Sequence, residues 1–141
     1  MFDKKFEDRM SLWREFRDML EVCEDPIQTA IDFYNQAPST TLAIDPYTQN
    51  TWPDPWQLLE ENVYCKFVKI LAICYSLQLT DRLSTSKFEI NITRDNKNSD
   101  THYLLMIDNF VVGFNGDSYV HRKDLPQTVY SELEYKMPPL H

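Results

Sequence analysis

The chain has 141 residues, of which 22 are acidic and 14 basic, and its formal charge at pH 7 is −8. Nucleic-acid binding through phosphate contacts needs clustered Lys and Arg, so this composition excludes a nucleic-acid partner. Only two glycines are present, which excludes a Gly-rich phosphate-binding loop. The length predicts a single domain spanning residues 1–141, and the aromatic share of 13% favours a packed core.

The first part of the chain, residues 1–53, predicts two helices followed by a loop. Apolar residues recur at three- and four-residue steps over residues 4–22, which is typical of an amphipathic helix. Asp25, Pro26 and Gln28 form a helix-start signal, and Pro38 predicts that the second helix ends near Ala37. A polar loop is expected over residues 39–53.

The helix-start signal recurs at Asp54, so a short helix is expected from Trp56 to Glu61. Asn62 is then a suitable N-cap for another helix, which would put Cys65 at its third position. From Cys65 to Leu79 the sequence is apolar nearly all round, which predicts a helix buried on several sides.

Beyond Asp81 the apolar period changes from helical spacing to alternation, which predicts strands. Strands are expected at residues 88–93, 103–107 and 110–114, and Asp108-Asn109 suits a two-residue hairpin turn. Residues 118–120 suit a short strand, whereas residues 127–135 fit a helix or a strand equally well. The predicted fold class is α+β, with N-terminal helices and the Cys65 helix packed on an antiparallel sheet of three or more strands.

The expected strand pairing, together with the Cys65 helix, suggests a Cys-His-Asn catalytic arrangement. If Asp108-Asn109 is the turn, Ile107 faces Phe110 and, by counting back, His102 faces Asn115 on the same side of the sheet. A thiol in the first turn of a helix is stabilised as a thiolate, and an imidazole held by an amide can take its proton. Cys65, His102 and Asn115 are therefore the candidate nucleophile, base and orienting residue.

At these residues the chain resembles a known family. The run from Pro55-Trp56-Gln57 through Tyr64-Cys65 to Thr80-Asp81-Arg82 is similar to the Cys-helix of transglutaminase-like proteins, within the wider papain-like fold. The segment from His102 to Asn115 is similar to the His strand, turn and Asp/Asn strand of that family. The resemblance implies a transglutaminase-like core at residues 54–120, with residues 121–141 as a C-terminal segment. It also implies thiol-dependent acyl transfer or amide hydrolysis on a protein or peptide, with Asp117 as the alternative to Asn115.

Three residues depart from the family pattern and motivate a different function. Val63 stands where the family has Gly, Lys69 where it has a small residue, and Leu104 where it often has an aromatic one. Taken alone, a Cys on an apolar helix is more often a core residue than a nucleophile. The alternative is a catalytically inactive binding or structural module. The whole chain resembles small proteins of T-even-like marine phages, which implies a place in a virion or its assembly.

The remaining expectations concern the cellular location of the protein and the groups that it could bind. No apolar run approaches the ~18 residues of a membrane span, and the three cysteines lack the spacing of a disulfide framework. A cytoplasmic location is expected, in the host cytoplasm or the virion if the protein is phage-encoded. The three His and three Cys show no ligand spacing, so neither a metal nor a cofactor is expected.

Overall fold

The computed structural model describes residues 1–41 and 44–140. Within these ranges the chain forms four α-helices and two 3₁₀-helices: α1 (Phe6–Val22), α2 (Pro26–Tyr34), η1 (Gln49–Thr51), α3 (Pro55–Glu61), α4 (Lys66–Gln78) and η2 (Arg122–Asp124).

Two helices begin where the sequence predicts. The side chain of Asp25 accepts a hydrogen bond from the Gln28 amide, and Asp54 with Gln57 forms a complete capping box at the start of α3. These bonds satisfy amides that a helix leaves without an internal partner. The Gln28 side chain does not close the corresponding box on Asp25; its Nε2 donates to the Asp32 side chain and to the Asp117 carbonyl.

Two helix boundaries differ from expectation. The second helix ends at Tyr34, not Ala37. Asn62 is not an N-cap: it has a left-handed backbone (φ 54°) and ends α3, with its amide bonded to the Leu58 carbonyl. As a result α4 starts later, and Cys65 is its N-cap residue rather than its third residue.

Five strands form one antiparallel sheet in the order β4-β3-β2-β1-β5. The fold is therefore α+β, as the sequence predicts. The segment that fitted helix and strand equally well is a strand at the sheet edge. The strands are β1 (Phe88–Asp95), β2 (Thr101–Ile107), β3 (Phe110–Asn115), β4 (Ser118–His121) and β5 (Val129–Met137).

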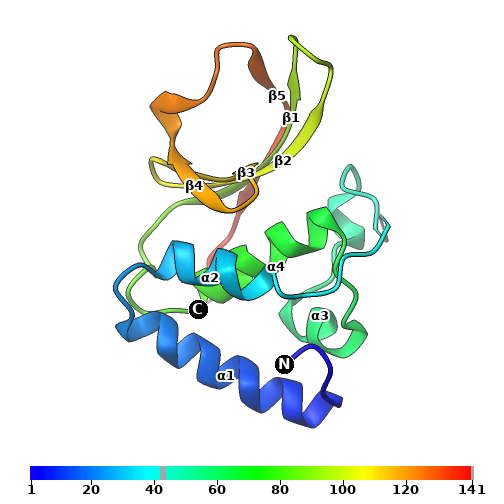
Figure 1. Ribbon diagram of the computed structural model, residues 1–141, viewed down its shortest axis with the longest axis vertical. Helices are drawn as coiled ribbons and strands as arrows, with labels where there is room; N and C mark the ends of the chain where they lie inside the picture. Colours follow the sequence, from blue (N-terminus) through cyan, green and yellow to red (C-terminus); the bar gives the residue numbers. More distant parts are fainter. Residues whose placement is uncertain (42–43, 141) are drawn as a thin grey trace.

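The helices gather against one side of this sheet, and the sheet curls away from them into a half-open arc (Figure 1). The larger hydrophobic cluster lies between the helices and the sheet and includes Trp13, Leu71 and Leu105. We call it the helix-side core. A smaller cluster on the other face of the sheet centres on Leu104, Met106 and Val111, and we call it the far-side core.

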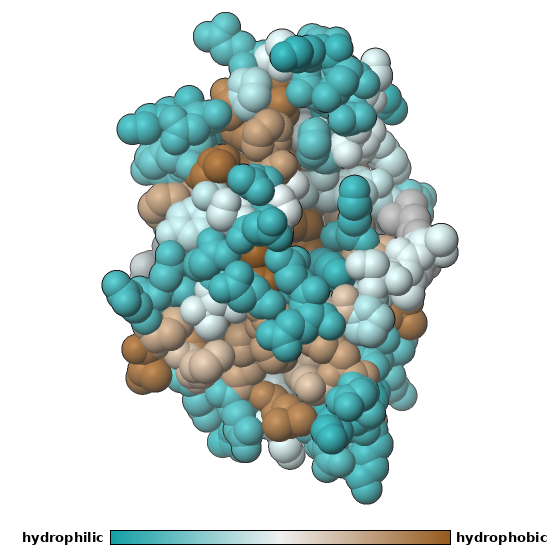
Figure 2. Space-filling model, viewed as in Figure 1, coloured by the Kyte–Doolittle hydropathy of each residue, from teal (hydrophilic) through white to brown (hydrophobic). Residues whose placement is uncertain are grey.

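The surface is mixed in character. Polar side chains cover most of the face drawn in Figure 2, with apolar residues between them over the curled sheet and again in the helical half. Among the described residues, no helix combines the length and apolar character needed to cross a bilayer.

Candidate functional site

Cys65 lies in the helix-side core at the first turn of α4. Its side chain is 1% exposed and makes no capping hydrogen bond to the helix. The start of the 39–53 loop is fastened beside it, because Ser39 bridges Tyr64 and the Thr40 amide donates to the Tyr64 carbonyl at 3.1 Å. Lys69 adds a hydrogen bond from Nζ to Ser39 Oγ at 2.8 Å. The thiol is therefore a covered core group at a helix start.

Tyr103 of β2 interacts electrostatically with Cys65. Burial raises the pKa of Tyr103, and the nearby Tyr47, Cys65 and Asp45 groups raise it further. Its ring packs edge-on against Phe67 of α4 at a centroid distance of 5.4 Å. A phenol with a raised pKa is protonated at neutral pH, so Tyr103 cannot accept the thiol proton. The alternation of Tyr103, Leu105 and Ile107 is the sequence signal that would have placed it on this face.

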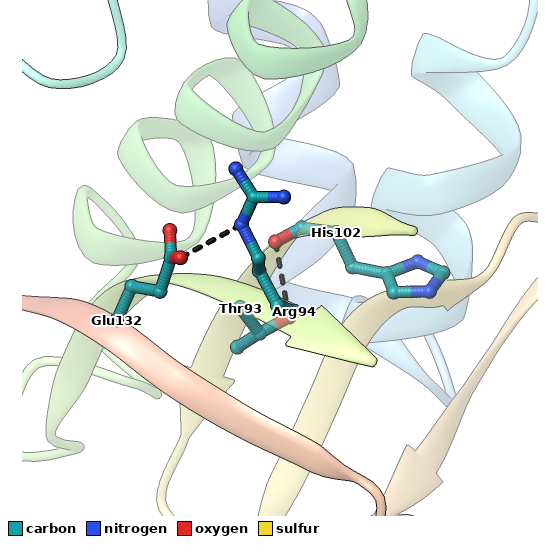
Figure 3. Close-up of polar contacts among 4 residues, drawn as sticks. All are labelled: Thr93, Arg94, His102 and Glu132. Carbon is teal, nitrogen blue, oxygen red and sulfur yellow. Dashed lines mark hydrogen bonds and ion pairs between the residues drawn. The ribbon is translucent and has the colours of Figure 1, made fainter. Parts of the chain in front are cut away.

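His102 lies on the opposite face of the sheet. It precedes Tyr103 in β2, and successive side chains in a strand point to opposite faces. Its ring contacts Phe114 of the far-side core at a centroid distance of 5.4 Å, while its carbonyl accepts a hydrogen bond from the Thr93 hydroxyl. In Figure 3 the imidazole extends from β2 away from the Arg94–Glu132 pair. The structure does not bring His102 and Cys65 together.

Gly113 explains why counting along the hairpin gave the wrong partner for His102. The pairs nearest the turn are as predicted, from Ile107 with Phe110 to Leu105 with Val112. Gly113 then adopts φ +105°, and the alternation breaks: Val112 belongs to the helix-side core and Phe114 to the far-side core. An irregularity of this kind shifts every later side chain to the other face. His102 therefore contacts Phe114, and Asn115 lies outside the ladder with β2.

Asn115 belongs to the tight turn between β3 and β4. It is exposed, and its side-chain oxygen accepts a hydrogen bond from the Asp117 amide at 3.4 Å. Helix α2 holds this turn, because Asn35 donates to the Gly116 carbonyl at 3.0 Å and Gln28 to the Asp117 carbonyl at 2.7 Å. Asn115 and Asp117 thus have a turn-forming role in this structure.

The other thiols have ordinary surroundings. Cys74, in the middle of α4, is fully buried, and burial raises the pKa of its thiol. Cys23, at the end of α1, is half-buried, and all three cysteines are free. Across residues 1–41 and 44–140, no group of three or more His, Cys, Asp or Glu side chains is placed to hold a metal ion.

No family model matches this chain, and no curated protein matches it in sequence.

Asp95, a charged neighbour of His102, gives a prediction on pH dependence. The Lys97 amide lowers the pKa of Asp95 most, followed by the Thr128 hydroxyl, and His102 contributes. A carboxylate with a lowered folded-state pKa stabilises the fold above its unfolded pKa of about 3.9, and this stabilisation is lost as pH falls through the folded pKa.

We expect Asp95→Asn to reduce stability by a constant amount above about pH 5, with the difference from wild type shrinking as pH falls below about 4. Chemical unfolding followed by circular dichroism from pH 7 to pH 2 measures this. Asp100→Asn, at an exposed position in the same hairpin loop, is the control. A difference that stays constant down to pH 2 would contradict the assignment.

Proposed function

We propose that this chain is a binding module without catalytic activity, acting stoichiometrically on a protein partner, and that Cys65 is a core residue. The observation that carries the proposal is the position of the candidate base: His102 contacts the far-side core, whereas Cys65 belongs to the helix-side core. A thiol nucleophile needs a base within hydrogen-bonding reach, directly or through one water.

The surroundings of Cys65 support the same conclusion. Its neighbour on β2 is a phenol rather than an imidazole, and the Lys69–Ser39 hydrogen bond fastens the loop beside it. The Gln57 side-chain oxygen accepts the Asp54 amide in a capping box, which fixes this side chain at the start of α3.

The transglutaminase-like resemblance of the sequence offers an origin for this scaffold. A helix with a Cys at its start, packed on an antiparallel sheet, agrees with that likeness at the level of the α+β class. We propose that the module keeps such a scaffold without the reaction. A place in a larger assembly, such as a phage particle, rests on the sequence resemblance alone.

The test is the reactivity of the thiols. We expect Cys65 in the native protein to react with iodoacetamide at least about a hundredfold more slowly than in guanidinium, because modification requires the fold to open. Half-buried Cys23 should react first. Mass spectrometry of the peptides, sampled over time between pH 5.5 and 8.5, measures each cysteine separately.

Cys74 provides the matched control, since it is equally buried on the same helix and has no candidate base. Similar slow rates for Cys65 and Cys74 are expected. Alkylation of Cys65 far ahead of Cys74, and persisting below neutral pH, would contradict the proposal. That result would favour the competing function, thiol-dependent acyl transfer, for which the N-cap position of Cys65 is the supporting observation.

A further inference from the structure

A cleft of about 620 Å³ lies at one end of the sheet, away from Cys65. Its walls come from segments that are distant in sequence: the connection between α4 and β1, the β2–β3 turn, the start of η2, and the chain following β5. The ends of β1 and β5 are adjacent here, because Phe88 pairs with Met137.

Three basic residues line this cleft: Lys87, Arg122 and Lys136. All three are exposed, and in the described part of the chain the single ion pair is Arg94–Glu132, elsewhere on the sheet. Their charges are therefore available to a ligand. On a chain with a formal charge of −8, such a group is a local reversal of sign.

Two carboxylates also line the cleft, and one of them accepts a hydrogen bond from the main chain. The Asp108 side chain accepts a hydrogen bond from the Lys87 amide at 2.9 Å, and the Arg122 guanidinium donates to the Asp108 carbonyl at 3.0 Å. Glu89 is the directly paired neighbour of Lys136 across the β1–β5 ladder. Three cations against two carboxylates leave the cleft with a net positive charge.

One wall of the cleft is apolar, beside the hydroxyl residues Ser84, Thr85 and Ser86. Phe88 is buried at the start of β1, and Met137, Pro138 and Pro139 follow along the chain that leaves β5. Gln78 donates to the Met137 and Pro138 carbonyls, which holds this segment against the end of α4. Apolar surface beside a net positive charge suits a ligand with anionic and apolar groups together.

We propose that this cleft binds a short extended peptide segment of a partner protein, in which Asp or Glu residues flank a bulky apolar residue. This inference rests on the proposed binding function and names its ligand class. The cations recognise the carboxylates, and the wall of Phe88, Met137 and the two prolines receives the apolar side chain. The strong negative charge of the rest of the chain disfavours a long polyanion such as nucleic acid.

The test uses the full chain and two fluorescein-labelled peptides, GDEFDEG and its charge-reversed counterpart GKKFKKG, with fluorescence anisotropy as the readout. We expect saturable binding of GDEFDEG that weakens as salt is raised, and no saturable binding of GKKFKKG. Lys87→Glu and Lys136→Glu should each weaken binding by about tenfold, because each reverses a charge that faces the ligand.

Lys123→Glu is the matched control. Lys123 is exposed and adjacent to Arg122 but does not line the cleft. Because it is also a Lys-to-Glu change, the variant has the same net charge as the other two. Its affinity should stay within about twofold of wild type. Circular dichroism and thermal unfolding of all three variants separate lost binding from lost folding.

Three results would overturn the inference: no saturable binding of GDEFDEG, equal affinity of Lys136→Glu and Lys123→Glu, or equal binding of the two peptides. Sedimentation of the wild-type chain tests a further alternative. Self-association that Lys136→Glu abolishes would also overturn the inference, because the occupant of the cleft would then be a second copy of this chain. None of these results depends on thiol reactivity. Failure of the ligand assignment is therefore distinguishable from failure of the proposed function.

Discussion

Gly113→Ala is expected to destabilise the protein by about 3 kcal/mol or more. An added Cβ would lie 2.4 Å from the Tyr103 carbonyl oxygen and 2.9 Å from Ile70 Cδ1, and φ at this position is +105°. The carbonyl belongs to the neighbouring strand and cannot move without disturbing the ladder. Urea unfolding followed by far-ultraviolet circular dichroism measures the change.

Gly116→Ala is the control on the other glycine of the chain. Apart from Gly116 itself and its two chain neighbours, no atom of the described residues lies within 4 Å of a Cβ built at Gly116. We expect its effect on the free energy of unfolding to stay within about 0.5 kcal/mol. Comparable losses in the two variants would mean that β3 is regular at Gly113, which would reopen the pairing of His102 with Asn115.

Arg9→Met is expected to destabilise the protein by about 2–4 kcal/mol, because it removes charge-assisted hydrogen bonds to main-chain carbonyls. Arg9 is a buried residue of α1 that donates from Nε to the Leu59 carbonyl at 2.9 Å and from Nη2 to the Glu60 carbonyl at 3.1 Å, and Nη1 donates to the Lys4 carbonyl. The Leu59 and Glu60 carbonyls belong to the last turn of α3, where a helix leaves its acceptors without internal partners.

Arg14→Met makes the same change at an exposed position of the same helix. Its effect on the free energy of unfolding should remain within about 0.5 kcal/mol. If the two variants unfold at the same urea concentration, Arg9 does not link α1 to the end of α3.

The fold could be predicted from the sequence wherever a local signal decides the structure. Asp25 and Asp54 start helices because their side chains satisfy free amides, and the alternation in β1 predicts a strand with one face on the helices. β5 could not be assigned, because most of its residues are exposed and its pairing with β1 is made across a long sequence separation. The left-handed backbone of Asn62 reversed its role, since Asn suits both a helix start and a helix end.

The candidate site could be predicted only in part, because the face that each side chain occupies was not decided by the sequence pattern. The sequence predicted a helix near Cys65 and a strand beginning just after His102, whereas Cys65 is the N-cap of its helix and His102 lies within β2. Their relation depends on which face each residue occupies, and Tyr103 rather than His102 faces the helices. The break in alternation at Gly113 has a sequence signal only in the rarity of glycine in this chain. The basic cleft has no local sequence signal, because its residues are far apart in sequence.

The strand order has a consequence for how the chain assembles during synthesis. β1 to β4 form a meander in which each strand pairs with the next, but the outer edge of β1 is covered by β5, the last strand along the chain. Until β5 has left the ribosome, β1 presents an open row of main-chain donors and acceptors beside buried apolar residues such as Ile90 and Ile92. A nascent chain stalled before that point would have an edge capable of recruiting other chains.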